Sequence, residues 1–185
     1  MIRQRAAWLP AVGPVHKPGR LYMSTLPEIK KILYVTDLGK HTRPVFRFAL
    51  SQARHYDAAL LMLHVVEPLG PTGKFYMDIY LNEDAATHFQ EEGQREVLAK
   101  MKKRLRLFCD EEVGACEMKK PPVTEIMVSS GEPSEEILRL ADKHKVDCIV
   151  IGRSTHALLG GNMMGSTARR VTRHSKVPVL LVPNR

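Results

Sequence analysis

The sequence has few cysteines and lacks long apolar runs, and each shortage excludes a class of protein. Its three cysteines, Cys109, Cys116 and Cys148, are too few and too unevenly spaced for a disulfide framework, and no Cys-x-x-Cys pair indicates zinc. No stretch of the sequence approaches the roughly 20 apolar residues of a membrane-spanning helix. These shortages predict a protein of the reducing cytoplasm with no membrane partner.

Acidic residues are also in short supply. The 185 residues include 28 Lys and Arg against 20 Asp and Glu, which gives a net charge of +8. A basic excess raises the question of nucleic acid or an anionic membrane surface. Half of the excess comes from the start of the chain, namely from Arg3, Arg5, Lys17 and Arg20. The basic cluster at residues 100–106 has no interleaved aromatics for base stacking, so we expect no nucleic-acid partner.

Residues 1–24 lack helical and strand periodicity and are rich in proline and glycine, which predicts a flexible leader. Residues 6–15 are apolar enough to suggest a signal peptide, but prolines interrupt them and no clear small-residue cleavage site follows. Because Met23 stands directly before the first structured stretch, translation starting at Met23 is an alternative. Residues 25–185 are long enough for one domain with its own core.

Strand and helix patterns alternate along that domain. Apolar runs predict strands at residues 29–37, 59–66, 123–128, 146–152 and 177–183. Helix-start signals and helical spacing predict helices that begin at Thr42 and Pro133, a helix that opens with Gly165-Ser166-Thr167, and a long helix over residues 82–108. Strand runs without polar alternation are typical of sheets buried on both faces. The sequence therefore predicts an α/β fold: a five-stranded, mainly parallel sheet with helices on both faces and right-handed crossovers.

Apolar side chains that recur every three or four residues predict the buried face of each helix. For the first helix these residues are Val45, Phe48, Ala49, Gln52, Ala53 and Tyr56. For the long helix they are Leu98, Met101, Leu105 and Phe108. For the helix at Pro133 they are Ile137, Leu138 and Ala141. In the fourth strand, Cys148 is expected to be a small core residue rather than a reactive thiol.

The last predicted strand carries a proline near each end, Pro178 and Pro183. Proline removes donors from a strand ladder, so this strand belongs at a sheet edge. An apolar edge promotes aggregation unless something covers it. We therefore expect a homodimer that forms through the C-terminal strand.

The stretch from Cys148 to Ser175 predicts an anion-binding turn. A buried strand ends at Gly152, and a helix opens at Gly165 and Ser166, while parallel sheets bind ligands at the carboxyl ends of their strands. Gly152 is expected to use positive φ or to let a ligand approach the backbone. Ser166 is expected to be the N-cap, with a hydroxyl that can also bind phosphate. A loop that needs glycine and a helix that needs a cap would give the same pattern.

The chain resembles the nucleotide-binding members of the universal stress protein family over about residues 28–183. Those proteins carry glycine, two residues, glycine, nine residues, then glycine and a serine or threonine, followed by a helix and a Val-Pro-Val-type strand. Gly152 matches the first glycine and Gly165-Ser166 the last pair, whereas Thr155 replaces the middle glycine. Val-Thr-Asp at 35–37 and Leu-His-Val-Val at 63–66 also fall in family order. Threonine at a glycine position is unfavourable wherever positive φ is required.

The resemblance implies a Rossmann-like fold of the adenine nucleotide alpha hydrolase type, with a site for ATP or AMP that usually includes magnesium or manganese. It implies that Asp37 contacts adenine, that Val65 meets the base through its backbone and that Gly152 lies near the ribose. It also implies that the start of the last helix holds the phosphates. The predicted nucleotide-binding residues are Thr36, Asp37, Val65, Gly152, Thr155, Gly165, Ser166 and Thr167.

The function predicted from the resemblance is a stress-response sensor or regulator that binds an adenine nucleotide. One alternative is a dimeric interaction protein of the same fold in which Thr155 has disabled the site. Another is a weak ATP hydrolase. Although His156 lies close in sequence to Ser154 and Ser166, and His64 stands near a strand end, no ordered nucleophile, base and third partner emerges. We therefore predict no catalytic residue, no metal ligand and at most slow hydrolysis.

Overall fold

The structure is a computed structural model that describes residues 26–39, 42–68, 83–116, 121–153 and 164–184. Within the long helix, side chains are described from residue 92 onward. The predictions made for the leader at residues 1–24 and for Thr155 lie outside the described residues.

The described strands form one parallel sheet in the order β3-β2-β1-β4-β5. The strands are β1 (Lys31–Val35), β2 (Ala59–Val66), β3 (Val123–Ser130), β4 (Cys148–Gly152) and β5 (Val179–Val182). This arrangement confirms the predicted five-stranded α/β fold and the edge position of the last strand. The opposite edge of the sheet is β3.

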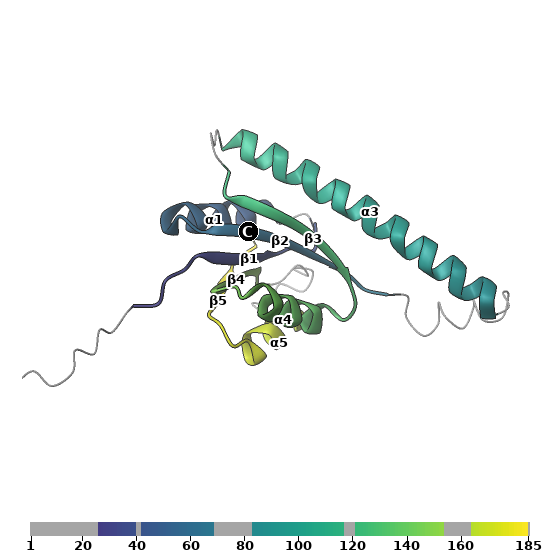
Figure 1. Cartoon of the computed structure of the whole chain (residues 1–185). Coiled ribbons are helices and arrows are strands. Elements are labelled where there is room, and N and C mark those ends of the chain that lie inside the picture. The colour runs from purple at the N-terminus through teal and green to yellow at the C-terminus, as the bar shows by residue number, and fades with distance from the viewer. Residues whose placement is uncertain (1–25, 40–41, 69–82, 117–120, 154–163, 185) are drawn as a thin grey trace, which may run out of the picture.

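Among the described residues, two helices cover each face of the sheet, with α1 and α3 above it and α4 and α5 below it in Figure 1. The helices are α1 (Thr42–Tyr56), α3 (Glu83–Ala115), α4 (Pro133–His144) and α5 (Ser166–His174). Successive strand side chains point to opposite faces, so β1 contributes to both layers of the core. Tyr34 packs with α1 and α3, whereas Leu33 packs with α4 and α5. A central strand with both faces buried accounts for the unbroken apolar run in its sequence.

Helix α1 buries a stripe that differs in part from the predicted one. Val45, Ala49 and Ala53 are buried as predicted. The predictions for Phe48 and Tyr56 are wrong, because these side chains are 39% and 50% exposed. Phe46 is fully buried instead, and its ring centroid lies 5.2 Å from those of Tyr34 and Phe108. The buried stripe extends from Val45, Ala49 and Ala53 toward Phe46, whereas the predicted stripe extended toward Phe48. Spacing within the helix fits both stripes, so it could not decide between them.

Helix α3 continues beyond the predicted end at Phe108 and stops at Ala115. Its last turns pack on the core through Cys109 and through Glu112, which is only 2% exposed. The Nε atoms of Arg47 and Arg43 on α1 lie 2.7 and 3.3 Å from the Glu112 carboxylate. A buried charge needs such partners, and these two arginines join α1 to α3. Because the buried face of α3 includes the acidic Glu112, the apolar pattern in the sequence ends before the helix does. The helix was therefore predicted too short.

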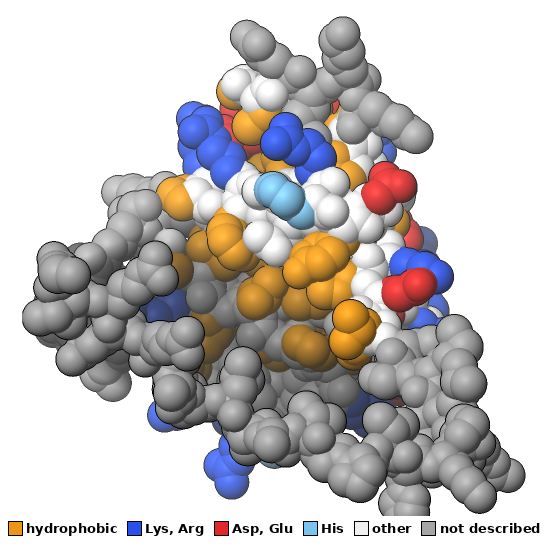
Figure 2. Space-filling model, turned by 90° about the vertical axis from the view of Figure 1, so that its left-hand side faces the viewer, with side chains coloured by type: hydrophobic (Ala, Val, Ile, Leu, Met, Phe, Trp, Pro, Cys, Tyr) orange, Lys and Arg blue, Asp and Glu red, His pale blue; other side chains and the backbone are white. Residues whose placement is uncertain are grey.

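Apolar side chains are not all confined to the core. Figure 2 shows hydrophobic side chains gathered near the middle of the face that lies at the left of Figure 1, below a group of lysines and arginines. At the sheet edge, Leu180 on β5 is 36% exposed. Pairing of two chains through β5 remains a prediction. No helix in the described parts of the chain is long and apolar enough to cross a membrane.

Candidate functional site

A cleft of about 310 Å³ opens where β1, β2 and β4 end. The sheet order explains its position, since the chain adds β2 and β3 on one side of β1 and then places β4 and β5 on the other. Connections leave in opposite directions at such a switch point, so a crevice remains outside the carboxyl ends of the strands. Residues of α1, α4 and α5, together with Asn184 after β5, form the rest of the lining.

The structure brings seven of the eight predicted site residues together in this cleft. They are Thr36, Asp37, Val65, Gly152, Gly165, Ser166 and Thr167. They come from the ends of three strands and from the start of α5, segments that are far apart in the sequence. The eighth, Thr155, falls between the described residues 153 and 164.

The end of β1 places Asp37 at the cleft through a tight turn. The Asp37 carboxylate accepts a hydrogen bond from the Gly39 N–H at 3.0 Å, which is a turn that aspartate commonly forms with its own backbone. The Thr36 hydroxyl accepts a bond from the Leu38 N–H at 3.0 Å, while the Thr36 N–H donates to Leu63 O at 3.0 Å. These bonds fix the backbone at the end of β1, and with it the position from which the exposed Asp37 side chain reaches the cleft.

The end of β4 is joined to both β5 and α5. The Arg153 N–H donates to Val182 O at 2.8 Å, and the Gly165 N–H donates to Arg153 O at 2.9 Å. A β-carbon at Gly152 would lie 2.5 Å from Asn184 Nδ2, closer than real atoms approach. Gly131 is the glycine with positive φ in the described part of the chain, so the expectation of positive φ at Gly152 is wrong. Glycine at 152 instead leaves room for the Asn184 side chain.

Helix α5 begins without a side-chain cap. Gly165 is the N-cap, with φ −59° and ψ 151°, and its carbonyl accepts from the Arg169 N–H at 3.0 Å. The prediction of Ser166 as the N-cap is therefore wrong, because Ser166 is already the first helical residue. Glycine has no side chain to accept bonds from the first N–H groups, which lack partners within a helix. With Ser166 and Thr167 lining the cleft, this helix start can bind an anion.

Helix α4, in contrast, already has a carboxylate at its start. Glu132 accepts a hydrogen bond from the Glu135 N–H at 2.8 Å and one from the Ser134 hydroxyl at 2.6 Å. Arg170 on α5 donates to the other Glu132 oxygen at 3.0 Å. The Ser134 hydroxyl, the Glu135 N–H and Arg170 lower the pKa of Glu132 below its usual value. The capped α4 and uncapped α5 therefore differ in their capacity for a further anion.

Four polar residues line the cleft that the sequence analysis did not select: Thr42, Glu67, Arg153 and Asn184. Glu67 directly follows β2, Arg153 directly follows β4, and Asn184 lies two residues after β5. The rule that ligands bind at the carboxyl ends of parallel strands could have found these three. Thr42 is harder to find, because α1 brings it to the cleft from the next layer.

Of the two histidines considered in the sequence analysis, His64 lies within the described residues and contacts the backbone of β1. His64 Nδ1 lies 2.8 Å from Thr36 O, and because a carbonyl only accepts, Nδ1 carries the proton. The imidazole thus holds the end of β1 against β2. Among the described residues, no three His, Cys, Asp or Glu side chains approach as a metal cluster would.

An ion pair between the partly buried Glu136 and the exposed Arg139 stabilises the turn from β3 into α4. Arg139 donates to Glu136 Oε1 at 2.8 Å and to Oε2 at 2.7 Å, and the Ser129 hydroxyl also donates to Oε2. Arg139, followed by Ser129, lowers the pKa of Glu136 to about 2. Gly131, with φ 152°, lets the turn pass directly over the Glu136 side chain. The carboxylate thereby couples the turn to α4.

We expect this carboxylate to make stability depend on pH. Since the folded pKa lies below the unfolded value of about 4.3, Glu136 stabilises the fold above that value. This contribution is lost as the pH falls toward about 2. Glu136→Gln should reduce the free energy of unfolding by about 1–3 kcal/mol at pH 7 and by roughly half as much at pH 3. Urea unfolding of both proteins at the two pH values measures the difference, and equal losses would contradict the account.

Sequence comparison identifies related proteins over nearly the whole domain. The family model described as "Universal stress protein family" matches residues 28–183. Universal stress protein MJ0531 of Methanocaldococcus jannaschii is 31% identical over 153 residues, covering 83% of this chain and 81% of the relative. Universal stress protein YxiE of Bacillus subtilis is 30% identical over 153 residues, covering 82% and 97%.

Solved structures share the fold. Universal stress protein UspA from Lactobacillus plantarum superimposes with a TM-score of 0.65 at 22% identity, covering 85% of this chain and 99% of that one. Hypothetical protein MJ0577 gives a TM-score of 0.61, also at 22% identity, with 86% and 99% covered. At this identity the likeness establishes the Rossmann-like fold.

Proposed function

Because the chain belongs to the universal stress protein family, we propose that it binds an adenine nucleotide, ATP or AMP, in the cleft at the carboxyl ends of the strands. Binding would let it act as a sensor or regulator in a stress response. The observation that carries the proposal is that seven of the residues implied by the resemblance line one cleft, beside the uncapped start of α5.

The proposed orientation follows from charge. Asp37 and Glu67 place carboxylates at the β1 and β2 end of the cleft, which disfavours phosphates there and suits the base. Gly165, Ser166 and Thr167 lie at the other end, where helix N–H groups favour an anion. Gly152 ends β4, which neighbours β1 in the sheet and precedes α5 along the chain, and we place it near the proposed ribose. Magnesium or manganese, if bound with the nucleotide, would neutralise part of the phosphate charge.

Two further parts of the proposal concern assembly and location. We propose that two chains pair through β5, whose outer edge has no neighbouring strand among the described residues and whose Leu180 is 36% exposed. Cytoplasmic location is supported by the three cysteines, Cys109, Cys116 and Cys148, all of which are free.

Thermal unfolding in the presence of ATP or AMP, with and without magnesium, tests nucleotide binding. A ligand that binds the folded state alone stabilises it by about 2.7 kcal/mol at a hundred times its Kd. We expect the melting temperature to rise with nucleotide concentration and to stay unchanged with inorganic phosphate alone. No stabilisation at millimolar nucleotide, together with no nucleotide in the purified protein, would refute the proposal.

Substitution of Thr155, which occupies the middle glycine position of the family motif, tests whether the site binds nucleotide or has lost that ability. Thr155→Gly should change the affinity for ATP by less than about threefold if the natural protein already binds it. Thr155→Ala, which keeps a β-carbon, is the matched control. A gain of tenfold or more on Thr155→Gly alone would instead favour the interaction protein that has lost its nucleotide site.

Slow hydrolysis of ATP is a second candidate, which the Asp37 carboxylate in the cleft favours. Phosphate release should fall in Asp37→Ala and in Ser166→Ala if the cleft performs the reaction. Unchanged release in both variants would assign the activity to a contaminant and exclude this candidate.

A further inference from the structure

The strand at the other edge of the sheet, β3, is long and only partly covered. Seven of its eight residues are registered with β2 on one side, and no described strand lies on the other side. Ile126, Met127 and Val128 are all partly exposed, although an apolar run of this kind is typical of a buried strand. Exposed strand edges offer unpaired N–H and C=O groups to another chain.

The hydrogen bonds to β2 show which backbone groups face that open edge. The Gly131 N–H donates to Val66 O at 3.1 Å, and His64 is registered with Val128. Backbone groups alternate in direction along a strand, so the N–H groups of residues 127 and 129 also face β2. The N–H groups of Ile126 and Val128 therefore face outward, where an added strand would accept their hydrogen bonds.

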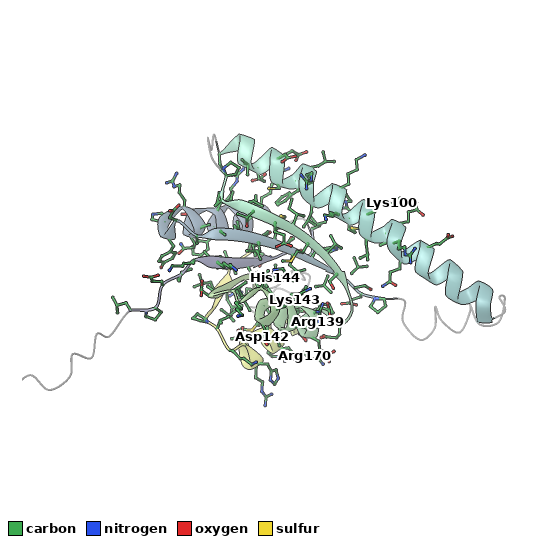
Figure 3. The ribbon with its side chains drawn as sticks, in the orientation of Figure 1. Lys100, Arg139, Asp142, Lys143, His144 and Arg170 are labelled. Atoms are coloured by element: carbon green, nitrogen blue, oxygen red, sulfur yellow. The ribbon has the colours of Figure 1, made fainter. Side chains whose placement is uncertain are left out.

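A groove of about 400 Å³ lies at this part of β3, between α3 and α4. Helix α3 passes on one side of β3, and Lys143 and His144 of α4 lie on the other (Figure 3). Leu98 and Leu140 give the groove apolar walls. We call this surface, formed by residues 125–129 with the facing residues of α3 and α4, the β3 groove.

Positive charge flanks the β3 groove from both helices. Lys102 of α3 and Lys143 of α4 line it, and neither forms an ion pair with another described residue. The groove's acid, Glu125, already faces the His144 imidazole, with Nδ1 3.5 Å from Oε2. An occupant with acidic side chains would therefore find two lysines without ion-pair partners at the rims.

We propose that the β3 groove binds an extended acidic segment of a partner protein, which adds to the sheet as a strand beside β3. The outward N–H groups of Ile126 and Val128 would supply main-chain hydrogen bonds, and Lys102 and Lys143 would select acidic side chains. The inference does not depend on nucleotide binding, because the β3 groove shares no lining residue with the cleft.

Two other occupants fit the groove less well. The chain's own first 22 residues carry basic residues and no acid, so the two lysines would repel them. Nucleic acid could meet the positive charge, but the groove lining contains no Phe, Tyr or Trp side chain for base stacking. A nucleic acid also lacks the alternating donors and acceptors of a peptide backbone, which the open edge matches.

Fluorescence anisotropy with a labelled peptide of alternating glutamate and valine tests the proposal on the full chain. We expect saturable binding at micromolar concentrations, and at least tenfold weaker binding to the Lys102→Glu/Lys143→Glu variant. Lys103→Glu/Arg173→Glu makes the same change of charge at exposed positions outside the groove, and it should alter binding by less than about threefold.

Val128→Pro tests the backbone pairing. Proline is tolerated on an edge strand where its missing N–H faces outward, so the sheet should remain while an outward donor is lost. Binding should weaken at least tenfold, whereas Val128→Ala, which keeps the N–H, should bind within about threefold of the natural protein. If Val128→Pro fails to fold, hydrogen exchange of the Ile126 and Val128 amides replaces it. Both amides should exchange freely in the natural protein and become protected by the peptide.

Several outcomes would overturn the proposal. The first is a lysine-valine peptide or a single-stranded oligonucleotide that binds as tightly as the glutamate-valine peptide. The second is peptide binding that the groove variants leave unchanged. The third is protection of the Ile126 and Val128 amides without peptide, which would show that a second copy or another part of this chain already covers the edge.

Discussion

Replacement of Phe46 by alanine is expected to lower the free energy of unfolding by about 3–5 kcal/mol. The Phe46 side chain is fully buried between α1, β1 and α3, and its ring contacts those of Tyr34 and Phe108. Truncation removes this apolar surface and leaves a cavity that the surrounding side chains fill only in part. Urea or thermal unfolding of the purified variant measures the loss.

The matched control for this prediction lies two residues along the same helix. Phe48 is 39% exposed, so Phe48→Ala should cost no more than about 1 kcal/mol. The two substitutions remove the same atoms from the same helix and differ in which side of α1 they occupy. Similar losses at the two positions would show that α1 is rotated relative to the sheet from the orientation described above.

Replacement of Ser166 by glutamate is expected to abolish nucleotide binding without unfolding the protein. The new carboxylate would sit at the uncapped start of α5, where negative charge stabilises a helix by about 0.3–1 kcal/mol. The same carboxylate would repel the phosphates from the N–H groups that we propose hold them. Affinity for ATP should fall by at least about thirtyfold, measured by isothermal titration, while the melting temperature without ligand stays equal or rises.

Ser166→Ala provides the control for the glutamate variant. If oriented N–H groups and the helix dipole hold the phosphates, loss of the hydroxyl alone should weaken binding by less than about tenfold. Equal and large losses in both variants would instead make the Ser166 hydroxyl the main phosphate contact. Unchanged binding in Ser166→Glu would show that the phosphates do not lie at the start of α5.

The fold could be predicted because strands of a parallel sheet are buried on both faces and therefore form unbroken apolar runs. For β2 the predicted and observed bounds agree, at residues 59–66. Cys148 is also a buried core residue, as predicted. The predicted first strand, at 29–37, was longer than the observed Lys31–Val35, because the residues that follow form the turn carrying Asp37.

Three of the errors share a physical cause, which is contact between segments far apart in the sequence. Glu112 is buried because Arg47, 65 residues away, pairs with it, so α3 outlasts its apolar pattern. Gly152 is needed because Asn184 packs against it, and no local pattern reveals that contact. The position of Phe46 rather than Phe48 in the core likewise depends on Tyr34 and Phe108.

The location of the candidate site could be predicted from the sequence to the extent that strand ends and helix starts determine it. Topology alone places the ends of β1, β2 and β4 at one edge, and the start of α5 follows β4 directly along the chain. The capping geometry at the start of α5 could not be predicted from the sequence, since either Gly165 or Ser166 could have been the N-cap. Because glycine has this role, the cap residue itself has no side chain that could bond to the first N–H groups of α5.

Amide chemical shifts during titration test the central proposal most directly. Addition of ATP should shift the amides of Asp37, Val65, Gly165, Ser166 and Thr167, whereas adenosine should shift the first two and leave the α5 residues nearly unchanged. That pattern would place the base at the ends of β1 and β2 and the phosphates at the start of α5. A titration with ATP that leaves all five amides unchanged would contradict nucleotide binding in this cleft.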